Sequence, residues 1–292
     1  MSRAPDGGGR SADVDIDQLR QWIGRERSVR DDMSPFPARA LGAALGRDAS
    51  PDAGAELPPC WHWLYFLDTP AASATGADGH PRLGSFLPPV PLPRRMWAAG
   101  SFAIEAPLVL GSPATRRTVI RSVESKSGRS GALVFVTLEH EVSQQGRTCI
   151  REQQQLVYRE APTAGAAMAP GQPPTGTADY SRSVEPDPVL LFRYSALTYN
   201  SHRIHYDRRY AMEREGYAGL VVQGPLLVTL LLELARERDA AARVRECSFR
   251  ALRPTLDLAP FRLQGRREAG KIELWSLDHE GCLGMTATVG IA

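Results

Sequence analysis

Alternating apolar and polar residues predict β-strands in two blocks, one in each half of the chain. Each block has four stretches of alternating or β-branched apolar residues that Gly, Ser or Pro bound. In the first half these stretches are 101–109, 115–126, 131–143 and 147–159. In the second half they are 246–254, 260–268, 271–278 and 282–291. The pattern therefore predicts the same four-strand series twice.

The most apolar helix is predicted directly before the second block. Residues 224–239, GPLLVTLLLELARERD, carry apolar side chains nearly all round the first three turns. Such a helix must be buried on most sides. A second helix is predicted where Ser34 can cap, Pro35 suits the first helical position and Gly46 can close the segment. A further amphipathic helix is expected to begin within 13–30.

The two strand blocks align with each other without a gap. Three pairs of identical residues, each 147 residues apart, mark the alignment: Phe102 and Phe249, Pro107 and Pro254, and Pro113 and Pro260. The offset is close to half the chain length, which indicates a duplicated fold. A buried helix followed by four antiparallel strands suggests a sheet curled around a helix. Two such sheets side by side make an α+β double hotdog, which is the fold we expect.

The division of the chain follows the same halves. We expect a flexible N-terminus over 1–14 and a degenerate, dehydratase-like hotdog over 15–160. A linker rich in Ala, Gly and Pro follows at 161–180, and a catalytic hotdog at 181–292. Shifting the second half's motif and helix back by the offset reaches a Gly- and Pro-rich region at 47–92. The first half is therefore expected to have kept the sheet and lost the site.

Composition and charge exclude several classes of protein. The chain is 42% hydrophobic and 23% charged, as in ordinary globular proteins, and its net charge of +2 does not indicate a nucleic-acid binder. Only two of the 35 basic residues are lysine, so arginine supplies the other 33, a bias typical of a GC-rich genome. No apolar run approaches the ~20 residues that span a bilayer. Without an apolar signal core at the N-terminus, we expect a cytoplasmic protein with no membrane partner.

The four cysteines are expected to be reduced and mostly buried. They are Cys60, Cys149, Cys247 and Cys282, and no two of them have the C-x-x-C spacing of a zinc site. The sequence therefore predicts neither a disulfide framework nor a cysteine metal site.

The densest chemistry lies in residues 194–211, YSALTYNSHRIHYDRRYA. This stretch resembles the hydratase motif of MaoC-like hotdog enzymes, with His205 and Asp207 at the family's positions. Three positions depart from that motif: Tyr199 stands where the family has glycine, Asn200 where it has the catalytic aspartate, and His202-Arg203 where it has Asn-Pro.

Those departures, with the following GYAGLVVQGPL, resemble the hydroxyacyl-thioester dehydratase type 2 group and its bacterial relatives, the mesaconyl-C4-CoA hydratases. WHWLYFL and EQQQLVYRE in the first half agree, so the resemblance covers 15–291. It implies reversible hydration of an enoyl-CoA. The best guess for the substrate is a branched C5 dicarboxylyl-CoA such as mesaconyl-C4-CoA. Itaconyl-CoA and a straight-chain 3-hydroxyacyl thioester are alternatives. An acyl-CoA thioesterase and a non-catalytic acyl-CoA binder are alternatives of another class.

The chemistry of hydration assigns roles within the motif. Water must be activated at Cβ, a proton delivered to Cα, and the enolate oxygen held by donors. We predict His205 as the acid/base, Asn200 as the group that positions the water, and His202 as a second titrating group. The N–H of Gly224, at the positive end of the buried helix, is predicted to face the thioester carbonyl. Pro225 lacks an N–H and cannot take part.

Four residues are candidates for substrate contacts: Tyr199, Arg203, Asp207 and Gln223. Arg203, like Arg94 and Arg95, could bind CoA phosphates or a substrate carboxylate, or could be a surface arginine. Asp207 fits an orienting or helix-capping group better than a base. No metal or redox cofactor is implied, since nothing supplies a further ligand beside His202, His205 and Asp207. The substrate is the expected partner, and a homodimer is compatible with the sequence.

The remaining histidines are weaker candidates. His140 lies on an alternating strand and is expected on a solvent face. His62, in an aromatic run, fits the core, and His279 fits a hairpin turn.

Overall fold

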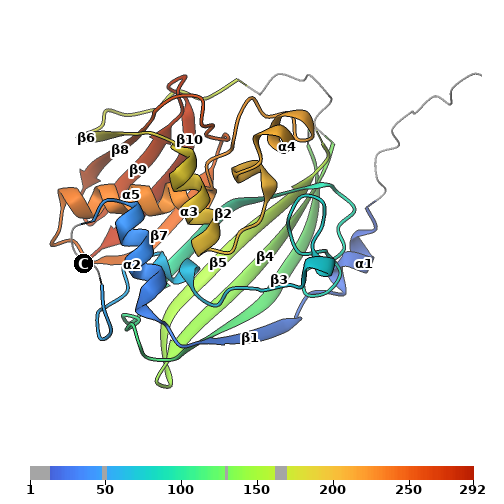
Figure 1. The fold of residues 1–292 in the computed structure, drawn as a ribbon, viewed down its shortest axis with the longest axis horizontal. Helices are drawn as coiled ribbons and strands as arrows, with labels where there is room; N and C mark the ends of the chain where they lie inside the picture. The colour runs from blue at the N-terminus through green and yellow to red at the C-terminus, as the bar shows by residue number, and fades with distance from the viewer. Residues whose placement is uncertain (1–13, 48–50, 129–130, 162–169) are drawn as a thin grey trace, which may run out of the picture.

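One antiparallel sheet of ten strands runs through the molecule (Figure 1), in the order β1-β3-β4-β5-β2-β7-β10-β9-β8-β6. The computed structural model describes residues 14–47, 51–128, 131–161 and 170–292. The strands of the first half are β1 (Glu26–Asp31), β2 (Arg94–Ile104), β3 (Ala114–Gly128), β4 (Gly131–Gln144) and β5 (Arg147–Arg159). Those of the second half are β6 (Tyr180–Val184), β7 (Val244–Ala251), β8 (Phe261–Glu268), β9 (Lys271–Leu277) and β10 (Leu283–Ile291).

The two halves of the sheet have the same connectivity. The strands run 1-3-4-5-2 in the first half and 6-8-9-10-7 in the second, and β2 pairs with β7 where the halves meet. Phe102 on β2 and Phe249 on β7 occupy corresponding strands, and Pro113 and Pro260 directly precede β3 and β8. The predicted duplication is therefore present in the fold, and the predicted double hotdog is confirmed.

All eight predicted strands are present, and two further strands, β1 and β6, were not predicted. Both lie at the outer edges of the sheet, where each has a single strand neighbour. Their sequences, ERSVRD and YSRSV, alternate only between exposed and half-buried positions. An edge strand needs few apolar residues because it buries little of its surface. Residues 1–13 of the predicted N-terminus (1–14) and residues 162–169 of the predicted linker (161–180) lie outside the described part of the chain.

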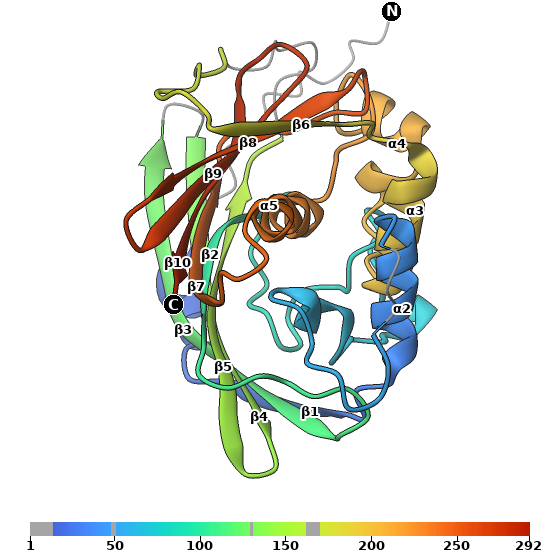
Figure 2. The ribbon, with the colours of Figure 1, turned by 90° about the vertical axis from the view of Figure 1, so that its left-hand side faces the viewer.

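The predicted buried helix is α5 (Gly224–Arg238), which packs against β8, β9 and β10. Its side chains from Leu226 to Ala235 are all buried. Figure 2 shows α5 end-on, with the curved sheet on one side and the helices α2 (Pro35–Ala44) and α3 (Pro188–Leu197) on the other. Burial on both sides explains why this helix is apolar nearly all round.

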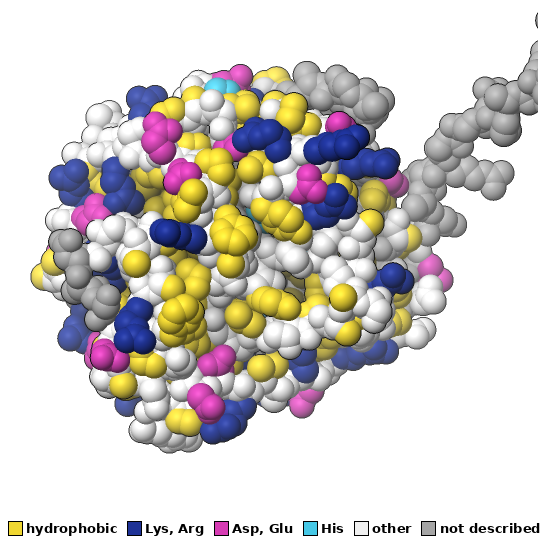
Figure 3. All heavy atoms as spheres, viewed as in Figure 1, with side chains coloured by type: hydrophobic (Ala, Val, Ile, Leu, Met, Phe, Trp, Pro, Cys, Tyr) yellow, Lys and Arg dark blue, Asp and Glu magenta, His cyan; other side chains and the backbone are white. Residues whose placement is uncertain are grey.

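Helices α2 and α3 pack against each other on the side of α5 that faces away from the sheet. Ser34 caps α2 by accepting a hydrogen bond from the Phe36 N–H, and Asp187 caps α3 in the same way. Figure 3 shows hydrophobic side chains gathered over these helices. Three large exposed apolar residues belong to them: Phe36, Val189 and Phe192.

Shorter helices complete the described chain. These are α1 (Ile16–Arg20) and α4 (Arg208–Glu213), with the 3-10 helices η1 (Trp61–Leu64), η2 (Ala72–Ala74) and η3 (Arg203–His205). Between α2 and β2 the described residues of the first half have only η1 and η2, so no long helix there matches α5. No helix of the described residues is long and apolar enough to cross a bilayer.

A buried polar cluster occupies the core of the first half. Glu152 on β5 accepts hydrogen bonds from Trp63 Nε1 and pairs with His62 Nε2, each at 2.9 Å. Burial alone would raise the pKa of Glu152, but the adjacent His62 and His140 lower it to about 2. His62 is thus a core residue, as expected.

The solvent face predicted for His140 is wrong. Its side chain is buried and its Nδ1 shares a hydrogen bond of 2.8 Å with the Thr118 hydroxyl. His140 continues the buried face of β4 that includes Leu138 and Val142. The same alternation that predicted the strand also places His140 on its core face, because residues two apart point the same way.

The four cysteines are free, as predicted. Three of them, Cys60, Cys149 and Cys247, are buried, and Cys282 is half-buried.

Candidate active site

The motif of residues 194–211 bends around the N-terminal end of α5. It begins on α3, passes through a turn at Tyr199 and Asn200, forms η3 and ends in α4. Tyr199 has a φ of +49° and is 55% exposed. A side chain in this left-handed region costs roughly 1–2 kcal/mol. The geometry explains why the related motif has glycine here, and it turns the Tyr199 ring toward solvent.

Asn200 closes the turn that carries the first motif histidine. Its side-chain Oδ1 accepts a hydrogen bond from the backbone N–H of His202 at 3.1 Å. Its own backbone N–H donates to the Ser195 carbonyl at 2.8 Å. The amide therefore fixes the backbone of the motif, a role that a carboxylate oxygen would fill equally well.

His205 is buried beside the segment that leads into α5. Its Nδ1 lies 2.7 Å from the carbonyl oxygen of Val221. Because a carbonyl only accepts, Nδ1 carries the proton and Nε2 is left with a lone pair. Burial lowers the pKa of His205 to about 4, although the bond to Val221 acts in the opposite direction. At neutral pH the side chain is therefore a neutral imidazole with a free acceptor.

His202 lies in contact with two other imidazoles. Its ring centroid is 4.0 Å from that of His80 and 5.5 Å from that of His205. Burial, followed by the neighbouring His80 and His205, lowers the pKa of His202 well below its usual range. We refer to His80, His202 and His205 as the histidine cluster.

His80 and its partner Asp78 were not predicted as site residues. They lie between η2 and β2, in the irregular stretch of the first half. His80 Nδ1 is 2.9 Å from Asp78 Oδ2, so Nδ1–H donates to the carboxylate and Nε2 is an acceptor. Burial lowers the pKa of His80, and the hydrogen bond to Asp78 opposes that shift. Burial would raise the pKa of Asp78, but the hydrogen bond to His80 keeps it low. The short D-x-H sequence was the only signal in a Gly- and Pro-rich region.

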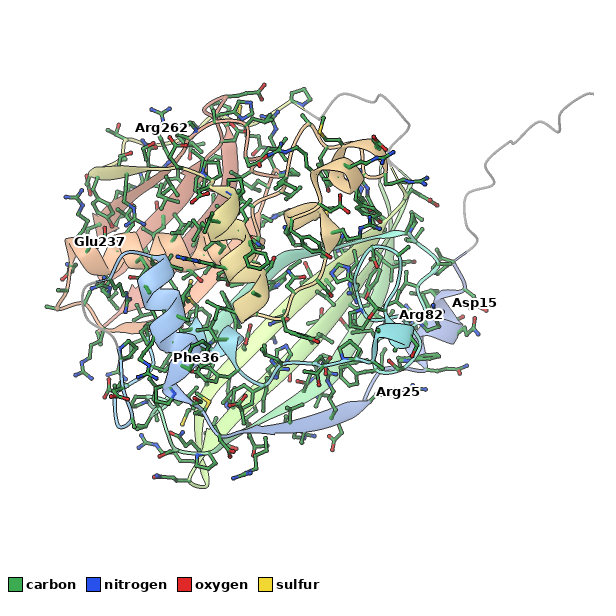
Figure 4. The ribbon with its side chains drawn as sticks, in the orientation of Figure 1. Asp15, Arg25, Phe36, Arg82, Glu237 and Arg262 are labelled. Atoms are coloured by element: carbon green, nitrogen blue, oxygen red, sulfur yellow. The ribbon has the colours of Figure 1, made fainter. Side chains whose placement is uncertain are left out.

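The loop that carries Asp78 is fastened to the motif of the second half. The Arg203 N–H donates to the Asp78 carbonyl at 2.9 Å, and the Ser201 hydroxyl donates to the Gly79 carbonyl. Gly79 has a φ of +91°, and a Cβ there would lie 1.8 Å from the Ser201 carbonyl oxygen. Only glycine allows this approach. In Figure 1 this teal loop lies beside the orange segment of α4, and Figure 4 labels Arg82, two residues beyond His80, in the same region.

Two of the predicted substrate contacts bind each other. Asp207 Oδ1 caps α4 by accepting the Tyr210 N–H at 3.0 Å, as the capping prediction anticipated, and Asp207 Oδ2 pairs with Arg203 at 2.7 Å. The Arg203 guanidinium also lies 4.2 Å above the Tyr210 ring and donates to the Ala77 carbonyl. These contacts hold η3, α4 and the Asp78 loop together, which favours a structural role for this ion pair.

Gln223 and Gly224 form the start of α5. Gln223 is fully buried, and its Nε2 donates to the Leu191 carbonyl and to Ser195 Oγ, both at 2.9 Å. It thereby ties α3 to α5. Gly224 is the first residue of α5, where a backbone N–H has no carbonyl of the same helix to bond. A Cβ on Gly224 would meet only Met285 Cε, at 3.8 Å.

A hollow of about 160 Å³ reaches His80 and Asp78 and is also lined by Arg95 of β2. The neighbouring Arg94 is paired with Glu215 at 2.9 Å. Arg95, in contrast, acts on the histidines, because its charge contributes to lowering the pKa of His80 and of His202. Two larger hollows of about 460 and 600 Å³ lie around β2, β5 and β7, and neither includes a residue of the histidine cluster.

Among the described residues, Asp78, His80 and His202 are the one group whose ligand atoms all lie within 4.8 Å of one another, close enough to hold a metal ion. His80 Nδ1 is already hydrogen-bonded to Asp78, so these two groups satisfy each other. Asp207 belongs to no such group in the described chain, because it caps α4 and pairs with Arg203. The contacts are those of a hydrogen-bonded carboxylate–imidazole pair.

Comparison with solved structures defines the class of fold. HtdX of Mycobacterium tuberculosis is similar with a TM-score of 0.63 at 17% identity, over 91% of this chain and 99% of that one. A second M. tuberculosis protein, whose description reports a double hotdog fold, is similar with a TM-score of 0.56 at 12% identity, over 92% and 96% of the two chains. The chain is a double hotdog protein in which His80, His202 and His205 lie together.

Sequence comparison gives the family. The family model of hydroxyacyl-thioester dehydratase type 2 matches residues 60–257. A mesaconyl-C(4)-CoA hydratase of Chloroflexus aurantiacus is 47% identical over 92% of this chain and 96% of its own length. The mitochondrial hydroxyacyl-thioester dehydratase type 2 of Schizosaccharomyces pombe is 29% identical over 71% of this chain and 77% of its own. The chain belongs to the hydroxyacyl-thioester dehydratase type 2 family.

Proposed function

We propose that this protein hydrates an enoyl-CoA reversibly, and that its substrate is a branched C5 dicarboxylyl-CoA such as mesaconyl-C4-CoA. The observation that carries the proposal is the buried His205, neutral and fixed in one tautomer, close in sequence and space to the N-terminus of α5. The substrate follows from the 47% identity with the mesaconyl-C(4)-CoA hydratase. Itaconyl-CoA and a straight-chain 3-hydroxyacyl thioester are the alternatives to be tested against it.

The site residues divide the work as follows. His205 Nε2 accepts a hydrogen bond from the attacking water and activates it, while Asn200 fixes the turn and positions that water. The N–H of Gly224 donates to the thioester oxygen, where negative charge develops as water adds to Cβ. The dipole of α5 points its positive end at that charge. Tyr199 lines the approach from the exposed turn, and the buried Gln223 supports the site by holding α3 against the start of α5.

The second carboxylate of the substrate needs a cation near the histidine cluster. Arg95 lines the hollow at His80, whereas Arg203 is paired with Asp207. We therefore assign the distal carboxylate to Arg95. An arginine–carboxylate pair in a partly buried hollow gives both affinity and orientation.

A panel of acyl-CoA esters tests the function. Purified protein is incubated with mesaconyl-C4-CoA, itaconyl-CoA and crotonyl-CoA, and hydration is followed as loss of the enoyl absorbance. A thiol reagent in parallel reports free CoA. Fast loss of absorbance with mesaconyl-C4-CoA and no free CoA is the expected result. Release of CoA would assign the protein to the thioesterases, and tight ester binding without turnover would make it an acyl-CoA binder.

A homodimer in the cytoplasm completes the proposal. Light scattering after size exclusion measures the oligomeric state, and a mass of one chain would refute the dimer.

A further inference from the structure

We propose that Asp78 and His80, supplied by the first half of the chain, replace the catalytic carboxylate whose position Asn200 occupies. His80 takes the proton from the attacking water and returns it to Cα, and Asp78 is the positioning residue that holds His80. The inference rests on the proposed hydration and names the group that holds the proton between addition of water to Cβ and protonation of Cα. Asn200 cannot do so because a side-chain amide does not titrate in the physiological range.

Hydrogen bonding prepares His80 for this task. Its Nδ1–H donates to Asp78 Oδ2 at 2.9 Å, which fixes the tautomer and leaves Nε2 as the acceptor. The His80 side chain is 21% exposed and that of Asp78 28%, so the pair can be reached, whereas His202 behind it is buried. A carboxylate behind an imidazole stabilises the imidazolium that forms when Nε2 accepts a proton.

His80 differs from the other two histidines in having a carboxylate partner, which acts against the lowering of its pKa by burial and by the Arg95 charge. Four charged or titrating groups face it: the Asp78 carboxylate, the His202 and His205 imidazoles, and the Arg95 guanidinium. His205 has only the neutral carbonyl of Val221 behind its Nδ1. An imidazolium at His80 therefore gains an ionic partner, while one at His205 does not. His205 accepts a hydrogen bond from the hydrogen that stays on the water oxygen, and His80 removes the other hydrogen.

The position of the loop is specified by the chain itself. Residues 76–80 are fixed internally by the Gly76 N–H, which donates to the His80 carbonyl at 2.7 Å, and by the His80 N–H, which donates to Asp78 Oδ1 at 3.0 Å. The same loop is fastened to Ser201 and Arg203 of the motif. This contact between the two halves of the fold brings the Asp78 carboxylate to the histidine cluster.

The proton and electron balance closes on one water molecule. The water oxygen forms a bond to Cβ as its proton passes to His80 Nε2. The π electrons of the Cα–Cβ bond form a double bond between Cα and the thioester carbon, and the carbonyl π electrons move to the thioester oxygen. The enolate that results is held by the Gly224 N–H. Its electrons then take the proton from the His80 imidazolium to form the Cα–H bond, and His80 is neutral again. In dehydration the steps run in reverse.

Three variants test the assignment against the wild-type protein. His80→Gln is expected to lower kcat by about 10²–10⁴-fold, the usual contribution of a general acid–base group, with little change in KM. Asp78→Asn is expected to lower kcat by at least about tenfold. His279→Gln, in a hairpin turn, is the control and should keep wild-type turnover. Circular dichroism confirms that each variant is folded.

The pH profile separates proton transfer from mere support of the loop. Asp78 favours the charged form of His80, so Asp78→Asn should move the acid limb of kcat/KM to lower pH. An unmoved limb, or near wild-type kcat in His80→Gln while wild type hydrates enoyl-CoA, would overturn this inference alone. A wild-type protein that hydrates no ester of the panel would overturn the proposed function as well. Activity lost on chelation and restored by zinc would assign Asp78, His80 and His202 to a cation instead.

Discussion

His205 Nδ1 lies 2.7 Å from the carbonyl oxygen of Val221, three residues before α5 begins at Gly224. Val221 is in turn fixed from the other side, because its N–H donates to the Ile204 carbonyl at 3.0 Å. The imidazole and the helix N-terminus are therefore held in one rigid arrangement. A neutral acceptor and a positive helix end are two of the features that addition of water to the double bond of an enoyl thioester needs.

The first prediction concerns His205 itself. His205→Ala is expected to lower kcat for hydration by about 10²–10⁴-fold, because the water loses its acceptor at Nε2. Stopped-flow or steady-state loss of enoyl absorbance measures the effect, with circular dichroism as the control for folding. Near-normal turnover in a folded His205→Ala protein would contradict the role given to this residue.

A matched pair of arginine variants tests substrate selection. Arg95→Gln is expected to lower kcat/KM for mesaconyl-C4-CoA by about 10–100-fold relative to crotonyl-CoA, as loss of a charged hydrogen bond costs about 1.5–3 kcal/mol. Arg203→Gln should change both esters alike, because its guanidinium is held by Asp207. If Arg203→Gln instead removed the preference for the dicarboxylyl ester, the carboxylate would belong to Arg203.

Gly79→Ala tests whether the loop must touch the motif. A Cβ at Gly79 would meet the Ser201 carbonyl oxygen at 1.8 Å, so the loop has to move and turnover should fall at least about tenfold. Gly84→Ala is the control, since Gly84 has a similar φ of +98° but its Cβ would meet only Pro89 Cβ, at 3.7 Å. Equal activities of the two variants would show that the loop contact is not needed.

Stability is expected to decrease below neutral pH because His202 and His205 are buried in their neutral form. The pKa of His205 is about 4 in the folded protein, below its usual value of about 6.5. The unfolded chain therefore binds more protons between these values, and the free energy of unfolding falls as the pH decreases. For His205 alone the loss is about 2 kcal/mol at pH 5. Urea unfolding at pH 7 and pH 5 measures it, and equal midpoints would refute it.

Glu152 is predicted to be a stability residue of the first half. Glu152→Ala leaves His62 and Trp63 without their buried partner and should cost about 3–5 kcal/mol of unfolding free energy. Glu139→Ala, which breaks the more exposed pair with Arg121, should cost about 1 kcal/mol or less. Chemical denaturation of both variants decides, and similar costs would contradict the assignment.

Local patterns predicted most of the fold. The apolar helix α5, the capped start of α2 and eight strands follow from periodicity, since each buries one face or all faces. The polar edge strands β1 and β6 were missed because little of their surface is buried. The offset between Phe102 and Phe249 predicted that the fold is duplicated, which the pattern of a single segment does not reveal.

The candidate site was only partly predictable. The motif residues His202 and His205 lie together, as their spacing and family position indicated. Asp78 and His80 were missed because they contact a motif that is far away in sequence. Ser201 and Gly79, which are hydrogen-bonded there, are 122 positions apart. Such a contact depends on how the two halves meet, and a D-x-H in a loop does not encode that. With the role proposed for Asp78 and His80, the first half contributes to the site that it was expected to have lost.

Hydration in water labelled with heavy oxygen tests the central claim most directly. After incubation with mesaconyl-C4-CoA, the mass spectrum should show an acyl-CoA that carries one added, labelled water, with the thioester intact. The His205→Ala protein should form this product far more slowly. Label in a free carboxylic acid beside released CoA, or no labelled acyl-CoA at all, would contradict the claim that this site is a hydratase.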